Sequence, residues 1–382
     1  MSEVEYKKYK LKELLTIKNG RDHKKLAEGA YSVYGSGGYM RSVNAFLYDR
    51  TSILLPRKGT LSNIQYVEGN PFWTVDTIYY TVLNEILYDP YYLYLYLNSL
   101  DLSGYDSGAS IPSMTSKTYY SLNVKLPEKK IQIKVANVLR TYENLIENNN
   151  KRIKLLEQMA ENLYKEWFVR FRFPGYEDVE FENGIPKGWE EVRIGEFINL
   201  KSGYAFKSDW WTDEGVPVIK IKDIQDGKID LTTLDYVSEE NAQKAKKFYV
   251  GKGDILIALT GATIGKVGIV TRDNVLVNQR VGKFFIEKPS IKNIGYTYNL
   301  FKQNWIQELI VMYSGSNAAQ PNISPFDIEK FRINYNKVYV DKFNETVYPI
   351  YDSIIKLYEK SDVLIKQRDL LLPRLMSGKL EV

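Results

Sequence analysis

The sequence predicts an α+β protein: two globular α/β domains separated by two long antiparallel helices that form a coiled-coil-like spacer, with an internal pseudo-twofold repeat. Three observations support this prediction. Residues 131–168 contain no Gly or Pro, and their apolar side chains alternate at spacings of three and four, as in a long helix with a packed seam. Residues 341–372 form a second amphipathic stretch. The segments upstream of the two stretches also match each other.

The match between the two halves extends well beyond the helices. Tyr142 aligns with Tyr351 at an offset of 209 residues, and the same offset aligns Pro112 with Pro321 in a segment that is not helical. Nearer the start of each half, SILLPRKGTLSNIQYV aligns with DILIALTGATIGKVGIV at a smaller offset. Extra loop residues in the second copy account for this growth of the offset. A tandem duplication explains all of these matches together.

Five segments follow from the alignment: a first globular domain at 1–129, a long helix at 130–173, a linker at 174–188 that is rich in Pro and Gly, a second globular domain at 189–337, and a second long helix with a C-terminal tail at 338–382. In the first domain we expect strands on either side of a loop at 57–59. We also expect a short helix that is capped by Asp89 and begins with Pro90.

Composition narrows the class of protein. The net charge of +5 permits a nucleic-acid partner without requiring one. The absence of cysteine excludes disulfides, thiol catalysis and Cys-ligated metals, and the single histidine, His23, is interpreted as a solvated loop residue. We therefore predict no metal site. A polar N-terminus and the lack of long apolar runs predict a cytoplasmic protein without a signal peptide or membrane span.

The sequence gives no catalytic constellation. The glycines at 35–38 lack the spacing and the following helix of a phosphate-binding loop. No pair of carboxylates recurs in both halves, although a duplicated enzyme is expected to keep its acid–base groups. We therefore predict no catalytic residues.

Loops rich in hydroxyl, amide and basic side chains are instead suited to contacts with phosphates and base edges. Ordinary exposed turns have the same composition, and the loops at 56–64 and 260–268 share little sequence, so their equivalence stays open. The candidate DNA-binding residues are Tyr34, Ser36, Arg57, Lys58, Thr60, Ser62, Asn63, Ser113 and Lys117 in the first half, and Tyr204, Lys207, Thr260, Thr263, Lys266, Asn278, Gln279, Arg280, Asn317, Gln320 and Asn322 in the second.

The residues along which the two long helices pack, here called the helix seam, are predicted from the spacing of the apolar side chains. Its residues are Val138, Tyr142, Leu145, Leu156, Leu163, Val347, Tyr351, Ile354, Ile365 and Leu372. Asn149 also falls in this phase, between Asn148 and Asn150. A buried Asn can fix the register of a helix pair. Alternatively, the triplet forms a solvated crossing with a partner or with DNA, and of the two interpretations we favour this one.

Three phrases, GIPKGWEEVRIGEFINLKSG, DILIALTGATIGKVGIV and SGSNAAQPNISPFDIEKFRI, together with the duplicated layout, resemble the DNA-specificity subunits of type I restriction–modification enzymes over essentially the whole chain. This resemblance implies that each domain recognises one half of a bipartite, asymmetric DNA target, while the helices act as a spacer. It also implies partners: double-stranded DNA, two modification (methyltransferase) subunits, and restriction subunits that translocate and cut DNA.

In such a complex the resemblance assigns S-adenosylmethionine, ATP and Mg to the partner subunits, so that this chain needs no cofactor and is not itself an enzyme. Two alternatives belong to other classes of protein. One is a self-contained, duplicated DNA methyltransferase or nuclease, and the other is a protein-only interaction scaffold.

Overall fold

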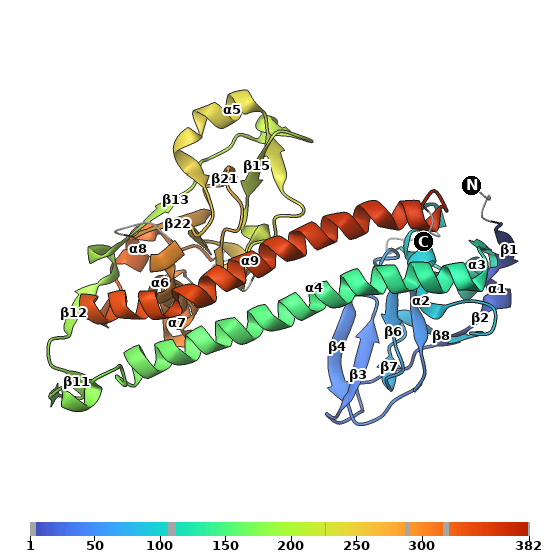
Figure 1. The fold of residues 1–382 in the computed structure, drawn as a ribbon, viewed down its shortest axis with the longest axis horizontal. Helices are drawn as coiled ribbons and strands as arrows, with labels where there is room; N and C mark the ends of the chain where they lie inside the picture. The colour runs from blue at the N-terminus through green and yellow to red at the C-terminus, as the bar shows by residue number, and fades with distance from the viewer. Residues whose placement is uncertain (1–4, 106–111, 226, 287–290, 316–320, 381–382) are drawn as a thin grey trace. The chain divides into compact units, whose positions relative to one another are not determined.

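The computed structural model describes residues 5–105, 112–225, 227–286, 291–315 and 321–380 of the 382-residue chain. The chain divides into two compact units, of which the first comprises residues 1–145 and 364–382 and the second residues 146–363. Each unit contains one globular domain and a stretch of both long helices, which are α4 (Lys129–Tyr164) and α9 (Lys337–Met376) (Figure 1).

In the first unit a four-stranded sheet of order β2-β8-β5-β6 accompanies a three-stranded sheet of order β4-β3-β7 and a two-stranded β1-β9 sheet. As predicted, Pro90 begins a helix, and the Asp89 carboxylate accepts the Tyr92 N–H at 2.9 Å. The elements are β1 (Lys7–Lys10), α1 (Leu11–Leu14), β2 (Leu15–Asn19), β3 (Tyr31–Gly35), β4 (Gly38–Val43), β5 (Ser52–Pro56), β6 (Gln65–Val67), β7 (Phe72–Thr74), β8 (Ile78–Leu83), α2 (Pro90–Asn98), α3 (Ser116–Ser121) and β9 (Asn123–Leu126).

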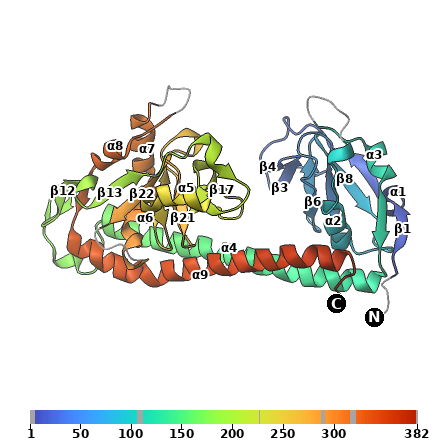
Figure 2. The ribbon, with the colours of Figure 1, turned by 90° about the horizontal axis from the view of Figure 1, so that it is seen from above.

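The second unit repeats this arrangement with additions. Its sheets have the orders β13-β22-β19-β20-β16, β14-β17-β15-β21-β18, β12-β23 and β10-β11. In Figure 2 the strands of this unit lie on one side of its helical stretch. The strands are β10 (Phe181–Glu182), β11 (Ile185–Pro186), β12 (Glu190–Arg193), β13 (Ile198–Ser202), β14 (Trp211–Thr212), β15 (Val216–Ile219), β16 (Gly227–Lys228), β17 (Asp235–Val237), β18 (Tyr249–Val250), β19 (Ile255–Ala258), β20 (Val267–Ile269), β21 (Val275–Val277), β22 (Val281–Ile286) and β23 (Arg332–Tyr335).

The duplication is visible in the pairing of these strands. The β1 strand pairs antiparallel with β9, which leads into α4, and β12 pairs in the same way with β23, which leads into α9. A parallel pair, β3 with β7 in the first unit and β15 with β21 in the second, also recurs. The helices of the second unit are α5 (Glu239–Lys244), α6 (Ile294–Lys302), α7 (Asn304–Tyr313) and α8 (Pro325–Glu329), and α8 begins 209 residues after α3, at the offset of the duplication.

The two long helices pack antiparallel within the second unit. Asn149 on α4 donates from Nδ2 to the Ser361 Oγ on α9 at 3.2 Å. In the π-helical segment Lys165–Val169 that continues α4, the Trp167 ring lies 5.5 Å from the ring of Phe343, which precedes Ser361 on α9. Ser361 is 3% exposed and Asn149 is half-buried. The interpretation that we favoured, a solvated crossing, is therefore wrong for Asn149, whose amide lies in the seam. A polar pair among apolar layers is a known way to fix helix register.

The predicted seam residues are buried to different extents. Val347, Tyr351 and Ile354 are fully buried, whereas Leu145 is 46% exposed. The prediction for Leu145 is wrong because the heptad phase passes from Tyr142 to Ile146, which places Leu145 beside the seam. The other predicted positions are half-buried: Val138, Tyr142, Leu156, Leu163, Ile365 and Leu372.

Charged side chains of α4 tie each globular domain to the helical stretch of its own unit. In the first unit the Arg140 guanidinium lies 4.5 Å from the centroid of the Tyr91 ring and pairs with Glu68 at 2.6 Å. In the second unit Glu157 accepts the Tyr298 hydroxyl at 2.9 Å and pairs with Lys302 at 3.5 Å. The Glu157–Lys302 pair is largely shielded from water, which strengthens it relative to an exposed ion pair, whereas Glu68 is exposed.

None of the helices within the described ranges combines the length and apolar character that a membrane span needs.

Candidate nucleic-acid interface

In the first unit the loop that follows β5 is held by its backbone. The Gly59 N–H donates to the Pro112 carbonyl at 2.9 Å, and the Met114 N–H donates to the Arg57 carbonyl at 3.0 Å. Gly59 has a φ of +89°, a conformation that favours glycine. Because backbone groups make these contacts, they do not occupy the side chains of the loop. Three of the predicted residues, Lys58, Thr60 and Ser62, are exposed.

A second loop, the β3–β4 turn, joins this one through side chains. The Asn63 Nδ2 donates to the Ser36 carbonyl at 2.7 Å, and the Ser36 N–H donates to the Thr77 Oγ1 at 3.3 Å. Gln65, which the sequence analysis missed, donates to the Gly35 carbonyl at 2.8 Å. The Arg57 N–H donates to the carbonyl of the same Thr77 at 2.9 Å. The structure therefore brings Ser36, Arg57 and Asn63 together, but the Asn63 amide donor already serves to hold the turn.

The second unit repeats the backbone anchor with different side chains. The Gly261 N–H donates to the Pro321 carbonyl at 3.0 Å, and the Ile323 N–H donates to the Leu259 carbonyl at 2.9 Å. These are the bonds of Gly59 and Met114 in the first unit, carried over by the duplication. The loops at 56–64 and 260–268 thus make equivalent backbone hydrogen bonds. Their unlike side-chain sequences did not show this equivalence.

Two predicted contact residues of this loop have structural partners instead. Thr260 is 5% exposed and its hydroxyl donates to the Pro321 carbonyl at 2.9 Å, so we assign it a structural role in place of the predicted DNA contact. Thr263 is half-buried, and its hydroxyl donates to the Ile221 carbonyl at 3.3 Å. Lys266 stays exposed.

A third segment, residues 278–280, meets the same loop. The Leu259 N–H donates to the Arg280 carbonyl at 3.0 Å, and the Gln279 N–H donates to the Tyr204 carbonyl at 2.8 Å. Asn278 is half-buried and accepts the Arg280 N–H at 3.3 Å, whereas the Gln279 and Arg280 side chains are exposed. Polar groups from three loops therefore converge in the second domain, as they do in the first.

The chain is similar to known proteins over both halves. The family model described as "Type I restriction modification DNA specificity domain" matches residues 3–158 and 186–339. The chain belongs to this family. Its two matched regions confirm that the specificity domain occurs twice.

Named relatives agree with this assignment, and a solved structure shares the fold. The MjaIX type I specificity subunit of Methanocaldococcus jannaschii is 26% identical over 88% of this chain and 79% of its own length. The MjaVIII subunit of the same organism is 27% identical over 78% of this chain and 72% of its own length. The crystal structure of the type I S subunit from M. genitalium shares the fold, with a TM-score of 0.62 and 17% identity over 98% of this chain and 97% of that one.

Beside the loop at 260–268 and residues 278–280, the second specificity domain has a lysine–aromatic cluster that the sequence analysis missed in part. Tyr204 stacks on Trp210 with ring centroids 5.9 Å apart, and the ammonium groups of Lys207 and Lys244 lie 5.7 and 5.1 Å from the Trp210 ring. Such clusters suit contacts with bases and phosphates. The adjacent tryptophans in SDWWTDEG were the available signal, but sequence does not show which lysines lie above them.

The second specificity domain also contains a buried acid. Asp223 is 2% exposed and its carboxylate accepts the Lys220 N–H at 2.8 Å. Burial raises its pKa from 3.8 to about 6, because the charged form loses its water.

The first specificity domain has a hollow of about 740 Å³ next to Ser36, lined also by Asp22, His23, Lys24 and Asp76. His23 is half-buried, with Nδ1 enclosed and without a hydrogen-bond partner among the described residues, so its interpretation as a solvated residue is wrong. The Lys24 N–H, which donates to the Asp22 carboxylate, lowers the pKa of that group.

The remaining predicted residues lie around these loops. Tyr34 is half-buried, with its ring edge-on to Tyr39 and Phe72. Ser113 and Asn322 form short β-bridges with Lys58 and Thr260. Lys117 is exposed on α3. Asn317 and Gln320 lie outside the described residues. Across the described ranges, no three His, Cys, Asp or Glu side chains gather in a way that could hold a metal.

Proposed function

We propose that this chain is the DNA-specificity subunit of a type I restriction–modification enzyme, and that each specificity domain recognises one half of a bipartite, asymmetric target. The observation that supports this most is the duplicated loop platform. Gly59 and Gly261 make the same backbone bonds, while the side chains beside them differ. A shared scaffold with unlike side chains suits two domains that bind in the same way to different base sequences.

In this proposal the chain itself recognises the DNA sequence and does not catalyse a reaction. Two methyltransferase subunits dock on it, and restriction subunits join the complex to translocate and cut DNA. S-adenosylmethionine, ATP and Mg act in those partners. Membership of the specificity-domain family and the hydrogen-bonding character of the loop side chains support this division of roles.

Helix length sets the separation of the two half-sites in this proposal. The α4 helix has 36 residues, so its length is about 54 Å at 1.5 Å per residue. At about 3.4 Å per base pair this bounds the separation near 16 base pairs. The Asn149–Ser361 layer fixes the register on which that length depends.

A gel shift with the chain and its methyltransferase, repeated at several salt concentrations, tests the proposal. We expect binding that weakens as salt rises, because phosphate contacts release counterions. Salt-independent or absent binding would favour a protein-only scaffold. Methyl transfer or cleavage by the purified chain alone would instead favour the self-contained enzyme.

A further inference from the structure

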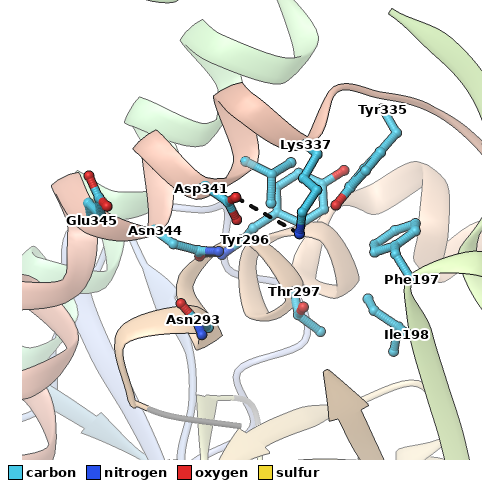
Figure 3. A pocket seen from close by; sticks show the side chains of 11 residues that line it. Phe197, Ile198, Asn293, Tyr296, Thr297, Tyr335, Lys337, Asp341, Asn344 and Glu345 are labelled. Atoms are coloured by element: carbon cyan, nitrogen blue, oxygen red, sulfur yellow. Dashed lines mark hydrogen bonds and ion pairs between the residues drawn. The ribbon is translucent and has the colours of Figure 1, made fainter. Parts of the chain in front are cut away.

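A cavity in the second unit contains none of the predicted DNA-binding residues. It lies where the start of α9 meets the start of α6, the start of β13 and the end of β23, and its volume is about 230 Å³ (Figure 3). Its lining includes Phe197, Thr297, Tyr335, Lys337, Asp341 and Asn344.

Two buried polar side chains of this lining have unused hydrogen-bonding atoms. Asn344 is 5% exposed, and its Oδ1 accepts the Tyr296 N–H at 2.8 Å. That bond fixes the orientation of the amide, so the Asn344 Nδ2 is the end without an acceptor among the described residues. Thr297 is 3% exposed, and its hydroxyl likewise has no partner there. Neither atom is among the fully enclosed unpaired atoms, so both retain access to the space of the cavity.

A third donor lies at the same place. Figure 3 shows the Lys337 ammonium between Asp341 and Thr297, and its distance from the Asp341 carboxylate is 3.9 Å, a loose ion pair. An ammonium, a hydroxyl and an amide NH₂ therefore converge on one cavity. The first turns of α6 and α9 also line it, and the positive ends of their dipoles add to the attraction for an anionic oxygen.

The charged residues at the rim of the cavity restrict the class of anion that can bind. Asp341 and Glu345 are exposed there, and their charges oppose an extended polyanion such as a DNA backbone. A single carboxylate meets less opposition because Lys337 offsets the charge of Asp341. The Phe197 and Tyr335 rings stack at 4.3 Å and give an apolar wall for the methylenes that carry such a group.

The first unit closes the corresponding place with its own side chain. Gln132, which the duplication aligns with Asp341, is 1% exposed. Its Oε1 accepts the Asp89 N–H at 3.0 Å, and its Nε2 donates to the Pro127 carbonyl at 2.8 Å. The shared fold therefore does not require a cavity here, and the hydroxyl of Thr297 and the amide of Asn344 are features of the second unit.

We propose that this cavity binds a carboxylate, held by Lys337, Thr297 and Asn344. The carboxylate is that of a small free acid or of an acidic side chain on a partner protein. This site does not depend on DNA recognition, so its test and the test of the proposed function fail separately.

The test is an NMR titration of the ¹⁵N-labelled full-length chain, observing the Asn344 side-chain NH₂ signal. The probes are sodium acetate, the peptide acetyl-Gly-Glu-Gly-amide, the same peptide with Gln in place of Glu, and inorganic phosphate. We expect a saturable shift with the carboxylate probes only. A tighter fit to the Glu peptide than to acetate identifies a protein side chain as the source, and the reverse order identifies a free acid.

Matched variants connect the shift to the three donors. One donor each is removed by Thr297→Val, Lys337→Gln and Asn344→Asp. Asn344→Asp keeps an oxygen for the Tyr296 N–H, and the backbone amide signal of Tyr296 reports binding in that variant, which lacks the side-chain NH₂. Each is expected to weaken carboxylate binding about tenfold, the usual effect of losing one hydrogen bond to a charged group. Lys342→Gln, an exposed lysine on the same helix outside the cavity, leaves binding unchanged.

For variants whose amide spectra show the native fold, unchanged binding overturns the proposal. No saturable shift with either carboxylate probe in the parent chain also overturns it. So does a stronger response to phosphate or to the Gln peptide than to carboxylate.

Discussion

Lengthening both long helices at their polar layer is expected to lengthen the spacer of the DNA target. The change is an insertion of four residues, about one helical turn, after Asn149 in α4, with a matching insertion before Ser361 in α9. Both helices must change because Asn149 and Ser361 face each other, and an insertion in one helix alone would slide the seam out of register. Four extra residues only unwind a heptad seam locally.

The size of the effect follows from helix geometry. Four residues add about 6 Å, which corresponds to between one and two base pairs at about 3.4 Å each. The contact loops at Gly59 and Gly261 are untouched, so both half-site sequences are expected to persist.

Base-resolution mapping of methylated DNA from cells that carry the variant and its methyltransferase measures both quantities. The matched control places four residues in the β10–β11 turn, at the exposed Asn183 and Gly184, and should leave the spacer as it was. A changed half-site with an unchanged spacer would refute the role of helix length.

Three further predictions concern stability and binding. Arg140→Ala removes the contacts with Tyr91 and Glu68 and should lower the free energy of unfolding by about 1–2 kcal/mol, measured by urea denaturation, while exposed Lys8→Ala changes it little. Because the pKa of Asp223 is raised to about 6, its contribution to stability is complete below pH 3.8 and is lost as the pH rises through 6. Asp223→Asn should remove this loss, which is about 1–3 kcal/mol, and thermal melts at pH 4 and 7 measure it. Equal pH dependence of the parent and the variant would contradict this prediction. Lys58→Gln and Lys266→Gln should each weaken DNA binding by the methyltransferase complex and reduce the slope of the logarithm of the binding constant against the logarithm of the salt concentration by about one. The control Thr260→Val should leave that slope unchanged. An unchanged slope in both lysine variants would exclude these lysines from phosphate contact.

The long helices and the duplication were predictable because periodicity and self-similarity are properties of the sequence itself. The heptad phase identified Val347, Tyr351 and Ile354 as seam residues, and all three are fully buried. The phase failed at Leu145 because two neighbouring apolar residues, Leu145 and Ile146, compete for one seam position, and only packing decides between them.

The candidate interface was less predictable because it depends on backbone contacts between distant segments. Composition marks Thr260 as a DNA-binding candidate, but its hydroxyl is used by the Pro321 carbonyl, 61 residues away. The open donors of Thr297 and Asn344 gave no sequence signal either. An unpaired buried group is recognised only when its surroundings are known.

Exchanging one specificity domain tests the central claim most directly. Residues 189–337 would be replaced by the matching domain of another family member, and methylated sites mapped at base resolution with the same methyltransferase. If each domain recognises one half-site, one half of the bipartite target changes while the other half and the spacer stay the same. A target that changes in both halves or in neither, in a complex that still methylates DNA, would contradict the account.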